Sequence, residues 1–228
     1  MLDELKDAVC AANRDLARLG LVTLTWGNVS GIDDSRERVV IKPSGVPYED
    51  LEPSHMVVVD LDGSVLEGEL KPSSDTATHL VLYRSFGSAA GITHTHSPYC
   101  TMFAQARREI RCFGTTHADH FFGAVPVTRA LTAEEVATDY EKMTGCVIVE
   151  RFGNVDPVAM PAVLVAGHAP FTWGASPSAS VKNAVALEAV AKMAIGTRWV
   201  DGDAPDLEEH VLEKHFQRKH GTNAYYGQ

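Results

Sequence analysis

The sequence lacks any Cys-x-x-Cys motif, which is the spacing typical of cysteine zinc sites and redox centres. Its four cysteines are widely separated and lie in segments with a helix-like or strand-like pattern. We therefore expect reduced, mostly buried thiols, with neither a disulfide framework nor a cysteine-ligated zinc ion. These residues are Cys10, Cys100, Cys112 and Cys146.

Long hydrophobic runs and a basic surplus are also missing. No segment reaches the roughly 18 consecutive apolar residues of a membrane-spanning helix. The formal net charge of −10 argues against the broad basic surface that binds nucleic acid. The segment 1–20 is charged and periodic, unlike a signal peptide. These absences predict a cytoplasmic protein without membrane or nucleic-acid partners, and they leave room for an anionic small substrate.

What the sequence does contain is a mixture of helical and strand patterns. Apolar residues recur at helical spacing from Leu2 to Leu19, and Gly20 stands where a helix commonly ends. Further helices are expected from Asp75 and from Ser97, and a capping box from Thr132 to Glu135 opens another that ends at Gly145. Two long helices are expected over 176–200 and 206–221. Strands are expected over 21–26, 38–43, 56–61, 65–70, 90–96, 146–152 and 162–168.

The order of these elements indicates the fold class. No repeated strand–helix–strand unit, internal repeat or linker is evident. We therefore predict an α/β fold in one domain over 1–228, with a mainly antiparallel or mixed sheet covered by helices on both faces.

Three histidines form the first candidate site. In "GITHTHSPYC" (91–100), His94 and His96 stand two apart, which places them on the same face of a strand. His168 ends the apolar segment "AVLVAGH" and would border a cleft. Each histidine alone is more often structural, but the three together indicate the three-ligand arrangement of catalytic zinc.

Three polar turns form the second candidate site. "KPSSDT" (71–76) offers two serine hydroxyls and free backbone N–H groups at a helix start, where an anion such as phosphate can bind. "KPSG" (42–45) repeats the Lys-Pro-Ser turn, and "WGNVSG" (26–31) is a Gly-Asn turn. Asp75 reads either as a helix cap or as a group that faces the metal, and the two readings are compatible.

Two further polar segments have weaker signals. "GTTHADH" (114–120) is a His/Asp cluster that is more often a loop with satisfied polar contacts than an active site. The tail "KHGTNAYYGQ" (219–228) would ordinarily fray, yet its two tyrosines could be ordered over a pocket by the histidine-bearing helix that precedes it.

These motifs together resemble the class II aldolase/adducin family, and within it the 4-epimerases of L-ribulose 5-phosphate. The resemblance spans nearly the whole chain and rests on several spaced motifs in order, including the tail. The matching segments are "LVTLTWGNVS", "VIKPSGV", "KPSSDT", "HTHS", "GTTHAD", "PFTWG" and "RKHGTNAYYGQ".

The resemblance implies a three-layer α/β/α fold with a central, mainly antiparallel sheet. It also implies a homotetramer with active sites at subunit interfaces and a divalent metal, usually zinc, with Mn²⁺ or Co²⁺ as alternatives. Carried over by position, His94, His96 and His168 become metal ligands and Asp75 takes the fourth metal-proximal place. The family often has a His-x-His at the third ligand, whereas "AGHAP" here offers only His168.

The resemblance also assigns proton transfer and substrate binding. Asp119 and Tyr226 become the acid–base pair, supplied to the pocket by a neighbouring subunit. The implied substrate is a phosphorylated ketopentose, whose C4 is inverted through cleavage and re-formation of the C3–C4 bond. The residues implied in binding it are Gly27, Asn28, Lys42, Ser44, Gly45, Ser73, Ser74 and Thr115, with His215 and Arg218 near the tail.

Two alternatives stay open at this point. A class II sugar-phosphate aldolase, such as fuculose-phosphate aldolase, would release the two fragments. Because these aldolases tend to have Glu at position 75, Asp75 favours the epimerase. A non-catalytic, adducin-like binding domain is the other alternative, although it has no need for the three histidines.

Overall fold

A computed structural model describes residues 2–222 and 224–226. Its strands are β1 (Asn28–Ile32), β2 (Arg38–Ile41), β3 (Val57–Asp60), β4 (Val65–Glu67), β5 (Gly91–His94), β6 (Ala162–Leu164) and β7 (Pro170–Gly174). Its helices are α1 (Leu2–Arg18), α2 (Thr76–Ser85), α3 (Pro98–Ala106), α4 (Thr115–Ala118), α5 (Ala133–Arg151), α6 (Pro177–Val200) and α7 (Glu209–His220), with a 3₁₀ turn η1 (Pro53–His55).

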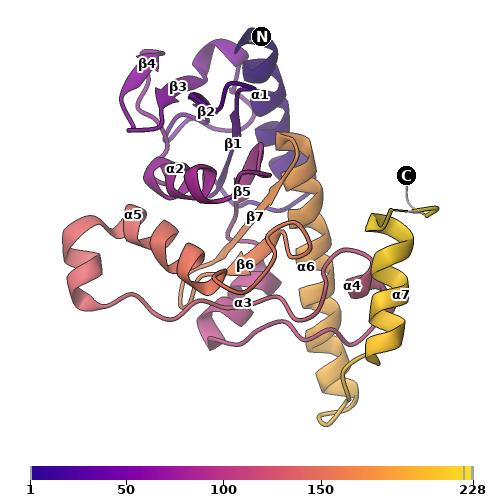
Figure 1. Cartoon of the computed structure of the whole chain (residues 1–228). Helices are drawn as coiled ribbons and strands as arrows, with labels where there is room; N and C mark the ends of the chain where they lie inside the picture. The colour runs from indigo at the N-terminus through magenta and orange to yellow at the C-terminus, as the bar shows by residue number, and fades with distance from the viewer. Residues whose placement is uncertain (1, 223, 227–228) are drawn as a thin grey trace.

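The strands form one sheet in the order β4-β3-β2-β1-β5-β7-β6, and all its ladders are antiparallel. Figure 1 shows α1 and α6 along one side of this sheet, with α2 and α5 on the other. The predicted α/β class, with a central antiparallel sheet between helices, is confirmed. No helix among residues 2–222 and 224–226 is long and apolar enough to cross a membrane.

Strand alternation distributes the core between the two faces. Val40 and Val58 pack in the cluster that α1 covers, whereas Val39 and Val59 pack in the cluster that α2 covers. Successive side chains of a strand point to opposite faces, so these nearly continuous valine runs fill both layers. The sheet is thereby held rigidly from both sides.

Two predicted strands are wrong. Residues 21–26 form turns, in which the Trp26 N–H donates to the Thr23 carbonyl and Leu24 is 74% exposed, because no neighbouring strand pairs with them. Residues 146–151 continue α5, which ends at Arg151 and not at Gly145, and Phe152 follows the helix. A Cβ at Gly145 would lie 2.7 Å from Val81 Cβ, so this glycine permits close packing between α5 and α2.

The other predicted elements exist, but the strands predicted over 65–70 and 162–168 are reduced to β4 (Val65–Glu67) and β6 (Ala162–Leu164). α1 ends before Gly20, which has φ +70°, and the Thr132–Glu135 capping box opens α5. The predicted strand over 90–96 is shorter, because β5 ends at His94. The last helix, α7, packs beside α4 at the end of the molecule remote from β4 (Figure 1).

Candidate active site

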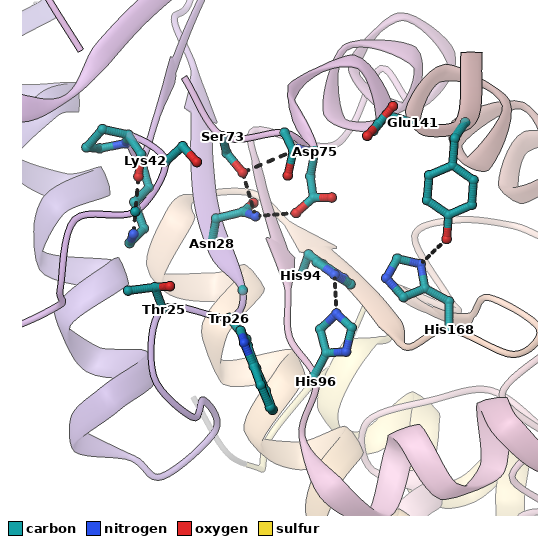
Figure 2. Close-up of a pocket in the computed structure, with 16 residues that line it drawn as sticks. Thr25, Trp26, Asn28, Lys42, Ser73, Asp75, His94, His96, Glu141 and His168 are labelled. Carbon is teal, nitrogen blue, oxygen red and sulfur yellow. Dashed lines mark hydrogen bonds between the residues drawn. The ribbon is translucent and has the colours of Figure 1, made fainter. Parts of the chain in front are cut away.

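The three histidines predicted as metal ligands come together where β5 and β7 meet. His94 is the last residue of β5, His96 follows two residues later, and His168 lies in the turn between β6 and β7. Their ligand nitrogens all lie within 4.8 Å of one another (Figure 2). The strand-spacing argument for His96 was wrong, since His96 lies beyond the strand, yet the pairing that it predicted exists.

The hydrogen bonds of His94 orient its ring for metal binding. Its Nδ1 donates to the Pro170 carbonyl at 2.9 Å, which leaves the lone pair on Nε2. That Nε2 faces Nε2 of His96 at 3.2 Å, and Phe171 stacks on the His94 ring with centroids 4.2 Å apart. The Pro170 carbonyl and the Phe171 ring thus hold His94 so that its Nε2 lone pair points toward His96, an orientation that suits a metal ligand.

The electrostatics of the cluster fit a cation. Burial, with a smaller effect of the nearby His94, lowers the pKa of His96 to about 4. Burial and the two other imidazoles likewise lower the pKa of His168 to about 4. Both rings are therefore neutral near pH 7, the form that coordinates a metal. These three residues fit a divalent ion in the open three-histidine arrangement of catalytic zinc.

Asp75 faces this cluster. It occupies the position before α2, but its carboxylate makes no capping hydrogen bond to that helix. Instead Oδ2 accepts a hydrogen bond from Asn28 Nδ2 at 2.7 Å. Burial would raise the pKa of Asp75, but the nearby His94 and His79 and the Asn28 hydrogen bond outweigh it and lower the pKa. A carboxylate kept ionised beside three imidazoles adds negative charge for a cation.

The two Lys-Pro-Ser turns lie side by side. The Ser44 N–H donates to the Lys71 carbonyl at 2.8 Å, and the Ser73 N–H donates to the Lys42 carbonyl at 3.0 Å. Pro43 and Pro72 form the bridge between these bonds. The repeated motif thus pairs with itself through the backbone and brings Ser44 and Ser73 to the same wall.

One cavity of about 610 Å³ unites these groups (Figure 2). Every residue predicted to bind metal or phosphate lines it, namely Gly27, Asn28, Lys42, Ser44, Gly45, Ser73, Ser74, Asp75, His94, His96 and His168. Lys42 is 2% exposed, and burial lowers its pKa to about 8. A positive side chain and serine hydroxyls at one end of a cavity are suited to an anionic group.

Sequence reasoning missed part of the cavity wall. Tyr140 and Glu141 reach it because α5 is kinked at Asp139, which has φ −162° and ψ 83°. Thr78 Oγ1 holds the Glu141 carbonyl at 2.5 Å, and Tyr140 Oη lies 3.4 Å from His168 Nδ1. No local motif predicts this kink. The remaining unpredicted wall residues are Thr25, Trp26 and Pro43.

The predicted proton-transfer residues form a second cluster, between α4 and α7. Asp119 accepts hydrogen bonds from Arg218 at 2.9 and 3.1 Å and from His215 Nδ1 at 3.1 Å. The Arg218 guanidinium lies 4.1 Å from the centroid of the Tyr226 ring. The prediction that His215 and Arg218 support the tail fits these contacts, and Gly227 and Gln228 lie outside the described residues.

This second cluster lies outside the cavity of its own chain. The lining of the cavity includes neither Asp119 nor Tyr226, and it also omits Thr115, which begins α4. Burial opposes ionisation of Asp119, but the hydrogen bonds from Arg218 and His215 outweigh burial and lower its pKa. The structure therefore holds an ionised, largely buried Asp119 outside the cavity that the imidazoles line. A second copy of the chain is needed if the two are to meet.

Comparisons with known proteins agree with this geometry. The family model of the class II aldolase and adducin N-terminal domain matches residues 7–195. The chain is 53% identical over 227 residues to L-ribulose-5-phosphate 4-epimerase UlaF of Salmonella paratyphi C, with all of both chains covered. The same identity and coverage relate it to the UlaF protein of Salmonella typhi.

Solved structures share the fold. An L-fuculose 1-phosphate aldolase superposes with a TM-score of 0.79 at 24% identity, covering 94% of this chain and 95% of the other. YgbL from Klebsiella pneumoniae, a putative aldolase/epimerase/decarboxylase, gives a TM-score of 0.75 at 23% identity, covering 94% and 98%. With the histidine cluster, the paired turns and the matched domain in agreement, the chain belongs to the class II aldolase and adducin family.

Proposed function

We propose that this chain is a zinc-dependent L-ribulose-5-phosphate 4-epimerase, an isomerase that interconverts L-ribulose 5-phosphate and D-xylulose 5-phosphate. The observation that carries the proposal is the three-imidazole cluster set in one cavity with serine- and lysine-bearing turns. Such a cavity fits a substrate with metal-binding oxygens at one end and a phosphate at the other. The printed name of the relatives at 53% identity supports the same reaction.

The chemistry of the substrate explains the need for a metal. C4 is not adjacent to the C2 carbonyl, so a carbanion at C4 would have no electron sink. Cleavage of the C3–C4 bond instead moves the electron pair toward that carbonyl and gives the enediolate of dihydroxyacetone with glycolaldehyde phosphate. Rotation of the aldehyde, followed by re-addition at its other face, inverts C4. A divalent ion held by the three histidines would supply the Lewis acidity that stabilises this enediolate.

The residues of the cavity hold the reactants. His94, His96 and His168 hold the ion, and the Asp75 carboxylate stands beside them. The hydroxyls of Ser44 and Ser73 bind the phosphate, and the Lys42 ammonium adds positive charge to the same wall. This anchoring keeps the aldehyde fragment in place until the bond re-forms.

Asp119 and Tyr226 of a neighbouring copy exchange the proton on the C4 oxygen, one on each side of the substrate. Their separation from the cavity within a chain supports an active site shared between subunits of a homotetramer. A cytoplasmic location is proposed with this function, since the substrates are phosphorylated sugars.

The direct test supplies purified, zinc-loaded protein with L-ribulose 5-phosphate. Formation of D-xylulose 5-phosphate without net release of dihydroxyacetone supports the epimerase. Accumulation of dihydroxyacetone and glycolaldehyde phosphate would instead identify a class II aldolase, and turnover of neither kind would favour the non-catalytic binding domain.

A second test addresses the bond that breaks. In deuterated water the hydrogen on C4 stays on its carbon if C3–C4 cleavage operates, because only the oxygen at C4 exchanges its proton. Mass spectrometry or NMR of the equilibrium mixture reads this directly. Deuterium at C4 would overturn the cleavage mechanism.

A further inference from the structure

Tyr48 is a buried tyrosine that the proposed mechanism does not use. It follows β2, is 3% exposed and does not line the cavity. Its hydroxyl donates to the Gly27 carbonyl at 2.7 Å and to the Trp26 carbonyl at 3.0 Å. Burial and the negative charge of Asp75 raise the pKa of Tyr48, so the phenol remains a protonated donor. Tyr48 therefore ties its own loop to the turn that precedes β1.

The turn that Tyr48 holds is packed against the metal-ligand strand. Gly27 has φ +95°, and a Cβ there would lie 2.7 Å from the His94 carbonyl oxygen. The next residue, Asn28, is the register partner of His94. A displacement of this turn would therefore move the wall that faces the imidazoles. The Tyr48 hydroxyl opposes that displacement from the outer side.

The ring of Tyr48 also contacts Lys42. The Lys42 ammonium lies 4.9 Å from the ring centroid and donates to the Val46 carbonyl at 2.8 Å and the Pro43 carbonyl at 3.2 Å. In the part of the chain that the structure describes, no carboxylate pairs with this ammonium. Its positive charge is held by carbonyl dipoles and a π-face and is not neutralised by any of the described carboxylates.

We propose that Tyr48 is a positioning residue that fixes the spacing between the Trp26–Asn28 turn and the Lys42 ammonium, and thereby sets the affinity of the cavity for the substrate phosphate. One side chain contacts both segments, through its hydroxyl and its ring respectively. This inference rests on the proposed function, because it takes the anion to be the phosphate of that substrate.

The test variant is Tyr48→Phe, which removes the hydroxyl and keeps the ring. Loss of one buried hydrogen bond predicts about a tenfold rise in KM and in the inhibition constant of inorganic phosphate. We expect kcat to stay within about twofold and zinc content to be unchanged, because the Tyr48 hydroxyl bonds the Trp26 and Gly27 carbonyls and not an imidazole. Tyr48→Leu, which also removes the ring beside Lys42, should raise both constants further.

The matched control is Tyr83→Phe. Tyr83 is 2% exposed and hydrogen-bonds Ser30 at 2.8 Å, but it does not line the cavity. The Tyr83→Phe variant should lose thermal stability as Tyr48→Phe does, but its KM and its inhibition by phosphate should be unchanged. Equal effects of the two variants on KM, or a Tyr48→Phe protein with only a lowered Tm, would show that Tyr48 is merely structural.

A measurement on folded protein covers the case in which Tyr48→Phe does not fold. 3-Fluorotyrosine placed at position 48 keeps both the ring and the hydroxyl, and its ¹⁹F resonance should shift as inorganic phosphate saturates the protein. A resonance that does not move while phosphate binds would overturn the role of Tyr48 alone. If the unaltered protein binds no phosphate by calorimetry, the proposed function fails, and this inference fails with it.

Discussion

The histidine cavity and the Asp119 cluster use different means to place their charged groups. In the cavity, backbone pairing sets the positions: β5 pairs with β7 beside the imidazoles, and the two Lys-Pro-Ser turns bond through main-chain atoms. In the second cluster, Asp119 is held largely by side chains of α7, above all Arg218. The cavity is therefore assembled within one chain, whereas the Asp119 cluster would serve it, under the proposed function, from a neighbouring copy.

The largest effect is expected from His96→Ala. Removing one of three ligands should abolish stoichiometric zinc binding and lower kcat by about a thousandfold or more, because the Lewis acid contributes several kcal/mol. Metal analysis and turnover assays measure both quantities. His210→Ala, at an exposed position of α7, is the control and should keep its zinc. Full metal content and activity in His96→Ala would refute the ligand assignment.

Asp119→Asn and Tyr226→Phe should lower kcat by about a hundredfold to ten-thousandfold, the usual worth of a general acid or base. Zinc content should be unchanged, since neither residue lines the cavity. Deletion of residues 224–228 should act like Tyr226→Phe. Turnover at the unaltered rate by the truncated protein would refute the assigned role of the tail.

Mixing two inactive variants tests whether the histidine cavity and the Asp119 cluster of one site come from different chains. His96→Ala and Asp119→Asn subunits, unfolded and reassembled together, should recover about a quarter of full activity if each site takes its cavity from one chain and Asp119 from another. Each variant reassembled alone is the control. A mixture as inactive as its components would mean that the two regions act within one chain.

A moderate effect is expected on the pH profile. Arg218 contributes to the lowered pKa of Asp119, so Arg218→Met should raise that pKa and move the acid limb of kcat/KM to higher pH. The ionised form of Asp119 would then be lost earlier as the pH falls. Arg111→Met, which breaks the surface ion pair with Asp206, should leave the limb in place. If the acid limb of the kcat/KM profile stayed in place in Arg218→Met, Asp119 would not be the group whose titration produces that limb.

The smallest effect is expected at Ser176, outside both regions. Its hydroxyl caps α6 by accepting from the Ala179 N–H at 3.1 Å, so Ser176→Ala should cost about 1 kcal/mol of unfolding free energy. Denaturant unfolding measures this loss, and kcat should not change. A parallel drop in kcat would mean that general destabilisation, rather than local chemistry, underlies the stronger variants.

The sequence predicted the cavity better than it predicted some of the elements around it. The resemblance and the turn motifs named residues that line one cavity, because these residues lie within short segments of fixed spacing. The strand prediction for residues 21–26 failed because β-propensity reflects how a side chain packs on a paired, half-buried sheet surface. In the structure these residues form turns and pair with no strand. The strand prediction for residues 146–152 failed because Gly145 was interpreted as a helix end. In the structure this glycine instead permits close packing of α5 against α2.

The remaining gaps concern contacts between distant segments. Tyr140 reaches His168 only because α5 bends at Asp139, and Tyr48 reaches Gly27 across a loop. Neither contact produces a periodic pattern or a local motif in the amino-acid sequence. The three histidines were found because their chemical type is rare enough to be matched across the chain, whereas tyrosines in loops have many ordinary roles.

The pairing of the two Lys-Pro-Ser turns has an evolutionary consequence. The hydrogen bonds that join the two turns to each other run between main-chain atoms, from Ser44 to Lys71 and from Ser73 to Lys42. Mutation can therefore exchange the groups presented to a ligand while the spacing of the turns is inherited intact. A scaffold of this kind can diversify in the molecules it accepts without first rebuilding its architecture.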